Sequence, residues 1–148
     1  MPSVDPLRRL AAALESSLAM YVADSGIWSY PGPEEIKLAL ADLVGDHKSL
    51  LDRAGTVLAD REVAAPRTAY PLSFTAGHDL DLRFLLPRII AGLDAQARVC
   101  DEVAAAGGDD ATAAQLARET VETNRRHADQ LRQLVAKSRA GLVDAKPL

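Results

Sequence analysis

Several features that define other classes of protein are scarce or missing in this sequence. The 148 residues include one cysteine, so an internal disulfide and a zinc site built from several thiolates are both excluded. No run of about 18 apolar residues occurs, and no basic-then-apolar segment opens the chain. Basic residues form no tail, and the net charge is −4, so neither nucleic acid nor a membrane is an expected partner. Together these absences predict a protein of the reducing cytoplasm.

The composition favours helices. Hydrophobic residues make up 48% of the chain and aromatic residues only 4%, and alanine, leucine, arginine and glutamate dominate. A chain of this length can bury a core without disulfides or metals, so residues 1–148 are expected to form one all-α domain. Cys100 has apolar neighbours, which predicts a core thiol instead of a reactive one.

Apolar residues three and four apart predict four helices, over about residues 5–25, 33–61, 79–106 and 110–140. Asp5-Pro6 is a typical helix start, and Gly107-Gly108 separates the last two helices. Pro87 lies inside the third segment, so we expect a kink or a broken first section there.

Residues 62–77 contain Pro66 and Pro71 and show no helical period. When extended, this stretch reaches about 50 Å, at roughly 3.3 Å per residue. The helix before it is about 40 Å long. The linker can therefore run the whole length of a bundle, whereas a hairpin needs only about 2–8 residues. This predicts an up-down-down-up four-helix bundle with a long crossover between helices two and three.

Five polar residues fall on the inward stripes of these helices. They are Thr120, Asn124 and His127 on the last helix, His47 on the second and Gln96 on the third. Polar groups at one depth of a bundle can form a metal or cofactor site. They can equally form a hydrogen-bonded structural network, and the sequence leaves both open. Two imidazoles without a carboxylate suit iron poorly, and zinc or copper would need a third ligand.

The chain resembles the ferritin-like superfamily, in particular bacterioferritins and the DNA-protecting miniferritins. The resemblance covers Leu7 to Leu134, including the crossover. It rests on Leu7-Arg8-Arg9-Leu10 through Tyr21, Trp28 with Gly32-Pro33, Asp46-His47-Lys48-Ser49-Leu50-Leu51, Leu93-Asp94-Ala95-Gln96-Ala97 and Arg126-His127-Ala128-Asp129-Gln130-Leu131. It implies a ferritin-like bundle with a di-iron centre near His47 and His127.

The resemblance also implies four glutamates, and none is present in register. The matching positions hold Leu14, Val44, Gly92 and Asn124. Glu15 and Asp94 lie one and two residues away, so a metal site with a shifted register would use His47, His127, Glu15 and Asp94. The intersubunit iron site of miniferritins is missing as well, because its positions hold Ile27, Ala54 and Leu58.

We therefore expect a ferritin-like protein without the standard ferroxidase ligands that acts as a structural or binding subunit. The missing glutamates argue against an enzyme without deciding the question. Its cofactor would be none, or a divalent metal such as iron or zinc. The resemblance also implies a homo-oligomer, a dimer or larger. Apolar residues near turns could form its interface or cover the bundle ends; these are Trp28, Tyr30, Tyr70 and Phe74.

The alternative is a metal-binding protein or enzyme that uses His47 and His127. One version is the unorthodox iron site above, for which Asp46 is a further candidate ligand. The other is similar to DinB-like bundles, which bind a divalent metal through three histidines; here the third would be His78. The customary partner four residues before the last histidine is replaced by Thr123.

Overall fold

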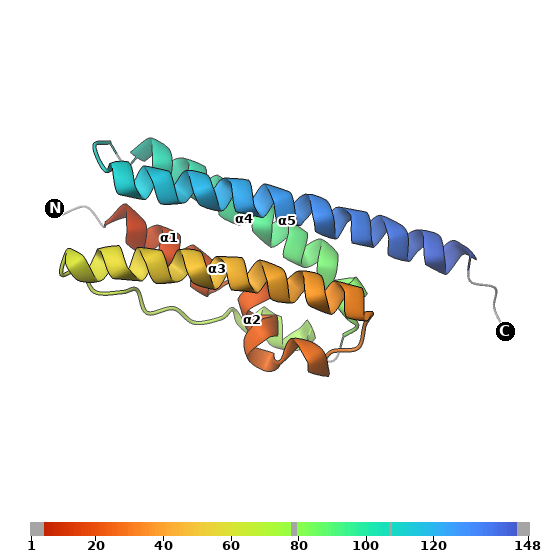
Figure 1. The fold of residues 1–148 in the computed structure, drawn as a ribbon. Helices are drawn as coiled ribbons and strands as arrows, with labels where there is room; N and C mark the ends of the chain where they lie inside the picture. The colour runs from red at the N-terminus through yellow and green to blue at the C-terminus, as the bar shows by residue number, and fades with distance from the viewer. Residues whose placement is uncertain (1–4, 78–79, 107, 145–148) are drawn as a thin grey trace.

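The computed structural model describes residues 5–77, 80–106 and 108–144, with side chains placed up to residue 138. Over these residues all regular elements are helices, as the composition predicted (Figure 1). The α-helices are α1 (Pro6–Glu15), α2 (Leu18–Ser25), α3 (Glu34–Asp60), α4 (Leu82–Ala106) and α5 (Ala111–Asp144). Two 3₁₀ turns, η1 (Ile27–Ser29) and η2 (Leu72–Gly77), lie in the connections.

The first predicted helix, residues 5–25, is two helices and not one. α1 ends at Glu15, and Ser17 caps α2 by accepting a hydrogen bond of 3.1 Å from the backbone N–H of Met20. Ser16 donates its hydroxyl to the carbonyl of Ala12, so both serines bond to the backbone around the break. Ser16 keeps its regular backbone bond to Ala12, whereas the Ser17 hydroxyl gives α2 a new start by accepting from its first turn.

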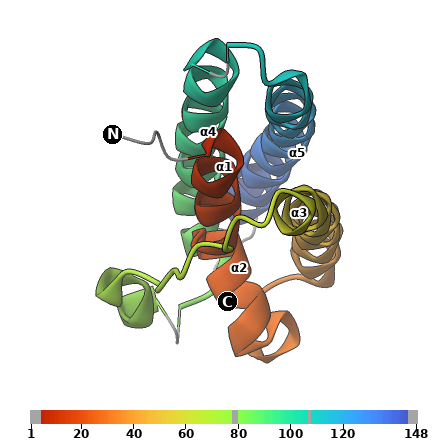
Figure 2. The ribbon, with the colours of Figure 1, turned by 90° about the vertical axis from the view of Figure 1, so that its left-hand side faces the viewer.

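The helix ends show how the bundle is arranged. The backbone N–H of Leu82, at the start of α4, donates to the carbonyl of Pro31, just before α3, at 2.8 Å. At the opposite end, the Arg61 side chain bonds both Asp5 and Asp110, which precede α1 and α5. Therefore α3 and α4 start at one end of the molecule, and α1 and α5 start at the other. The linker runs back along the bundle between them (Figures 1 and 2).

The close approach of α4 to the turn before α3 requires glycine at position 32. Gly32 has φ of +145°, and a Cβ there would lie 3.1 Å from the Cβ of Leu82. A side chain would be strained by both the backbone conformation and this contact. Gly32 thus allows the two parallel helices to begin side by side.

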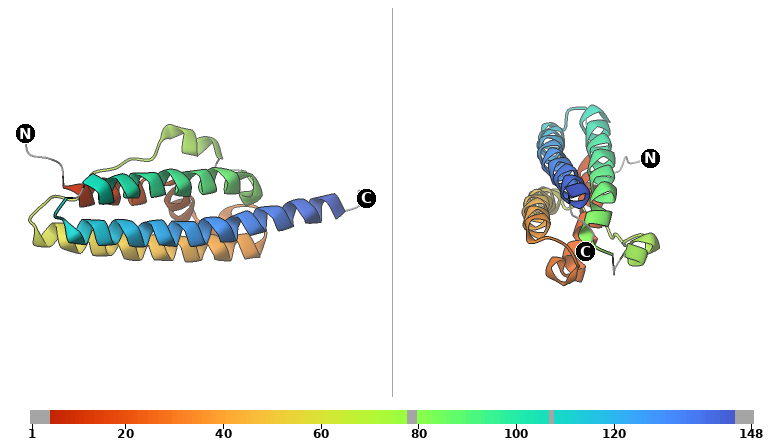
Figure 3. Two further views of the ribbon diagram at one scale, coloured as in Figure 1. Left: turned by 90° about the horizontal axis from the view of Figure 1, so that it is seen from above. Right: turned by 90° about the vertical axis from the view of Figure 1, so that its right-hand side faces the viewer.

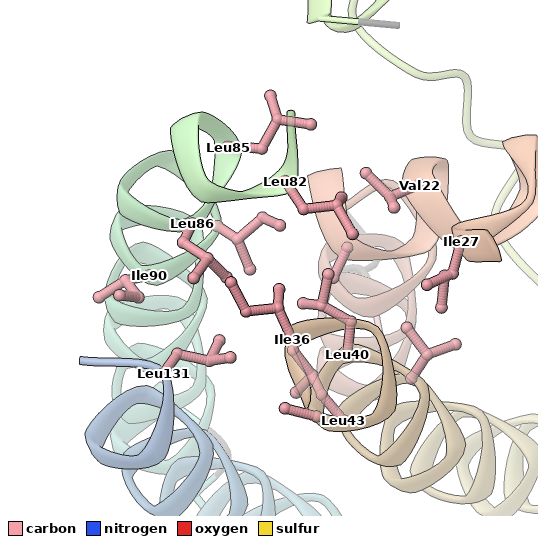
Figure 4. Close-up of a cluster of buried hydrophobic side chains, with 14 of the residues drawn as sticks. Val22, Ile27, Ile36, Leu40, Leu43, Leu82, Leu85, Leu86, Ile90 and Leu131 are labelled. Carbon is pink, nitrogen blue, oxygen red and sulfur yellow. The ribbon is translucent and has the colours of Figure 1, made fainter. Parts of the chain in front are cut away.

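The buried apolar side chains form two clusters along the bundle. The first gathers α2, the beginnings of α3 and α4, and Ala128 and Leu131 of α5 (Figure 4). The second joins α1 with the later parts of α3 and α4 and the beginning of α5. Each fully buried leucine in them contributes roughly 1.5–3 kcal/mol. Cys100 is fully buried in the second cluster, as predicted, and burial raises the pKa of its thiol to about 12.

Pro87 does not break α4, which is continuous from Leu82 to Ala106. The proline removes one N–H donor, the partner of the Arg83 carbonyl in a regular helix. Both Pro87 and Arg83 are exposed, so water can satisfy that carbonyl. None of the helices that the structure describes combines the length and the apolar character needed to cross a bilayer.

Three of the four apolar turn residues are held within the chain's own fold. Tyr30 is 2% exposed, and Tyr70 and Phe74 form an aromatic cluster with Tyr21, at centroid distances of 5.2 Å and 5.7 Å from it. Only Trp28 is largely exposed, at 58%. The aromatic cluster fixes the linker to α2, and Figure 3 shows η2 standing at the side of the bundle.

Candidate functional site

The central polar layer (His47, Gln96 and Asn124) lies between the two apolar clusters. Along α3, His47 comes between Val44 of the first cluster and Leu50 of the second. Gln96 and Asn124 hold the same position along α4 and α5. All three side chains are at most 5% exposed, so each requires hydrogen-bond partners inside the bundle.

A chain of hydrogen bonds joins four helices through this layer. Gln96 Nε2 donates to the carbonyl of Ala13 in α1 at 2.9 Å. Asn124 Nδ2 donates to Gln96 Oε1 at 2.7 Å and to the carbonyl of Leu93 at 3.2 Å. Asn124 Oδ1 lies 2.7 Å from His47 Nε2 in α3. The layer therefore connects α1, α3, α4 and α5 at one level.

The backbone carbonyl groups of Ala13 and Leu93 determine which atom donates in each hydrogen bond of the layer. Because Ala13 and Leu93 offer only acceptors, Gln96 and Asn124 must turn their amide nitrogens toward them. Asn124 Oδ1 is then the acceptor, so His47 carries its proton on Nε2. Burial lowers the pKa of His47, which is consistent with a neutral ring. Its Nδ1 atom is a buried lone pair with no partner among the described residues.

The break in the first helix takes part in the layer. Because α1 ends at Glu15, the carbonyl of Ala13 belongs to the last turn and lacks an N–H partner within its helix. The amide of Gln96 supplies that hydrogen bond from across the bundle. The serine pair and the central glutamine are thus parts of one local arrangement.

The other two polar stripe residues are buried but have different partners. Thr120 is fully buried, and its hydroxyl donates to the Leu116 carbonyl of its own helix at 2.8 Å. His127 is 2% exposed, and its Nε2 lies 2.6 Å from Asp46 Oδ2. Arg126 donates to the same oxygen at 3.0 Å. The hydrogen bond from His127 is the main reason that the pKa of Asp46 lies below its ordinary value.

The two acidic residues of the expected metal set lie elsewhere. Glu15 is exposed at the end of α1, and Asp94 forms an ion pair of 2.8 Å with Arg132. In the part of the chain that the structure describes, no three His, Cys, Asp or Glu side chains gather where they could hold a metal ion. His78, the third histidine of the alternative, lies outside the described residues.

A pocket of about 520 Å³ adjoins the polar layer, and we call it the α1–α4 pocket. It lies where the α1–α2 break, η2 and one face of α4 meet. Its lining includes Ala13, Leu18, Phe74, Leu85, Arg88 and Gln96. The lining is mainly apolar, with one cation and the Gln96 amide, and its volume is typical of small-molecule sites.

Two parts of this arrangement were not predicted from the sequence. One is the bond between Asp46 and the buried His127, and no sequence signal marks that pairing. The α1–α4 pocket was also missed. The adjacent serines and the small residues Ala13, Gly92 and Ala95 could have indicated it, because small side chains leave space between helices.

No family model, curated protein or solved structure matches the chain. The likeness to ferritin-like proteins therefore stays a prediction that rests on the residues quoted above.

Proposed function

We propose that the chain is a ferritin-like, up-down-down-up bundle that acts as a structural or binding subunit and does not oxidise iron. The observation that carries this proposal is the hydrogen bonding of Asn124. Its amide bonds His47, Gln96 and the Leu93 carbonyl at the position where the resemblance implies a glutamate. Support for the topology comes from the helix ends, since α3 and α4 begin together and the linker returns along the bundle.

The donor atoms in the bundle centre do not suit a di-iron site. Such sites use carboxylates that bridge two iron ions, together with histidines. Here His47 Nε2 carries a proton that Asn124 accepts, and the carboxylate of the preceding residue, Asp46, is bound to His127 and Arg126. An ion bound at His47 Nε2 or at the Asn124 amide would replace hydrogen bonds that these atoms already make, and we derive no chemistry through iron.

Metal analysis tests this proposal. The purified protein is incubated with ferrous iron, zinc or manganese, and bound metal is measured by mass spectrometry, together with the rate of iron oxidation. We expect no stoichiometric metal and no acceleration over iron in buffer. Stoichiometric metal that disappears in His47→Ala or His127→Ala would contradict the proposal.

One observation favours the second candidate, a divalent metal site that uses His47 and His127. His47 Nδ1 is a buried lone pair without a partner among the described residues, and His127 is also buried. Zinc accepts imidazole nitrogen, so this candidate predicts stoichiometric zinc instead of iron. The same incubation separates the two functions.

The proposal also includes self-association and a cytoplasmic location. Large apolar side chains are exposed at Trp28, Leu72 and Phe84, by 58%, 87% and 71%. Exposed apolar groups of this kind can form contacts between subunits. A fully buried thiol, Cys100, suits a reducing compartment. Light scattering of the purified chain gives the mass that decides between monomer and oligomer.

A further inference from the structure

We propose that the α1–α4 pocket binds an amphipathic small molecule, with its apolar part between α4 and η2 and an anionic group at Arg88. This inference names the ligand class for the binding role proposed above, and so it rests on that role.

Small residues create the hollow. Small residues of both helices line the pocket, namely Ala13 of α1 and Gly92 and Ala95 of α4, and none of them has a side chain that could fill it. Gly92 lies inside α4, where glycine is a poor helix former. A Cβ placed on it meets no atom within 4 Å, so packing against a neighbour does not require the glycine. The space in front of Gly92 is therefore open to a ligand.

The wall opposite α4 is held in place from outside the pocket. Phe74 of η2 lines the pocket and lies 5.7 Å from the ring of Tyr21 in α2. Tyr70 contacts the same tyrosine, and its hydroxyl donates to Asp24. These contacts fix η2 beside α2, so the pocket is preformed. A preformed apolar pocket loses little entropy when an apolar group enters it.

The charge of the lining selects an anion. Arg88 lines the pocket, and the described lining residues include no aspartate or glutamate. Within the described part of the chain Arg88 has no ion pair, whereas Arg83 of the same helix is paired with Asp81. The whole chain has a net charge of −4, so the positive charge of Arg88 at the pocket does not reflect the overall charge of the protein. A carboxylate, sulfate or phosphate group would pair with this guanidinium.

The pocket also touches the central polar layer through one residue. Gln96 lines the pocket, and its amide bonds both the Ala13 carbonyl and Asn124. Asn124 in turn bonds His47. A ligand that contacts Gln96 should shift the NMR signals of the His47 ring, which lies on the far side of Asn124. This shift reports where the ligand binds.

Titration with decanoate, followed by calorimetry and NMR, tests the inference. Gly92→Leu fills the pocket, and Gly45→Leu is the matched control, since Gly45 is also inside a helix with open space before it. We expect Gly92→Leu to weaken decanoate binding about fifteenfold, because each methylene kept out costs roughly fourfold and leucine displaces about two. Gly45→Leu should bind as the unaltered chain does. Ala95→Leu repeats the test if Gly92→Leu does not fold.

The role of charge is tested with ligands that share the ten-carbon chain of decanoate but carry a different head group. Arg88→Gln should weaken decanoate binding about two- to fivefold, the range for an exposed ion pair, and leave 1-decanol unchanged. Decyltrimethylammonium should bind more weakly than decanoate. The inference is wrong if decanoate does not bind, if Gly92→Leu and Ala95→Leu bind it normally, or if the cation binds equally well.

The two proposals fail in different ways. If the unaltered chain binds neither decanoate nor stoichiometric metal, the proposed ligand class is wrong. The proposal of a bundle that does not oxidise iron then still stands. Stoichiometric metal at His47 would contradict the proposed function, whether or not decanoate binds.

Discussion

Asn124 makes more hydrogen bonds to other helices than any other residue of the central polar layer, and it is 1% exposed. Asn124→Ala removes three hydrogen bonds in the core. The groups that each lose one are the His47 N–H, the Gln96 amide oxygen and the Leu93 carbonyl. A buried polar group left unsatisfied costs about 1–3 kcal/mol. We expect the variant to lose about 3 kcal/mol in the free energy of unfolding, measured by urea denaturation.

Thr120→Val is the matched control for this prediction. Thr120 is also fully buried in α5, but its hydroxyl bonds only the Leu116 carbonyl of its own helix. The substitution keeps the side-chain shape and removes one hydrogen bond, so it should cost about 1 kcal/mol or less. If Asn124→Ala were no more destabilising than Thr120→Val, the chain of hydrogen bonds would not be a stabilising feature.

At this scale the sequence predicts burial better than it predicts partners. Helical spacing placed His47, Gln96, Thr120, Asn124 and His127 inside, and all five are at most 5% exposed. It did not predict that His127 binds Asp46 of α3, or that Thr120 bonds its own helix. Burial of a side chain follows from the apolar repeat along its own helix. Its hydrogen-bond partner depends on how two helices are rotated relative to each other and on the side-chain rotamers, and the repeat of one helix contains neither.

At the scale of helices, Arg61 connects three ends. Its guanidinium follows α3 and bonds Asp5 and Asp110, whose carboxylates also accept the backbone N–H groups of Leu7 and Ala113. Arg61→Gln should lower the free energy of unfolding by about 1–2 kcal/mol, because charge-assisted bonds that join the ends of three helices are lost together. Thermal and urea unfolding measure the change.

Arg83→Gln serves as the comparison for Arg61→Gln. Arg83 also pairs with a carboxylate, that of Asp81, but the two are neighbours in sequence and the arginine is exposed. Exposed local pairs contribute little, so no measurable loss is expected. Equal effects of the two substitutions would show that Arg61 does not join separate helices in solution.

Helix positions were predicted well where the apolar repeat is long. The expected helix 33–61 is α3 at Glu34–Asp60, and the expected 110–140 begins at Ala111. The break at Ser16–Ser17 was missed, because Leu14, Leu18 and Val22 keep a helical spacing across it in the sequence. In the structure α2 instead buries Ala19, Met20 and Val22, so the buried face changes at the break. An apolar repeat contains no information on whether the backbone hydrogen bonds continue.

At the scale of the whole molecule, the length of the linker determines the arrangement of the helices. Arg61 lies at one end of the bundle and Leu82 at the other, beside Pro31. The linker must therefore cover the length of α3, about 40 Å at 1.5 Å per residue. Part of it is compact, because η2 is a 3₁₀ segment fixed to α2 through Phe74. The linker therefore has few residues beyond those needed to cover this length.

Deleting residues 64–69 should therefore destroy the fold, whereas lengthening the linker should not. The six residues supply about 20 Å of extended chain, and without them the linker cannot reach Leu82 while η2 stays on α2. We expect the deletion to give a chain that unfolds at much lower urea concentration or exchanges helices with a second copy. Six glycine and serine residues inserted after Arg67 should cost only about 0.2 kcal/mol, because loop-closure entropy grows slowly with length. If α3 and α4 instead ran in opposite directions, a short turn would suffice and the deletion would be tolerated. Urea unfolding and light scattering of the two variants thus test the parallel arrangement of α3 and α4 directly.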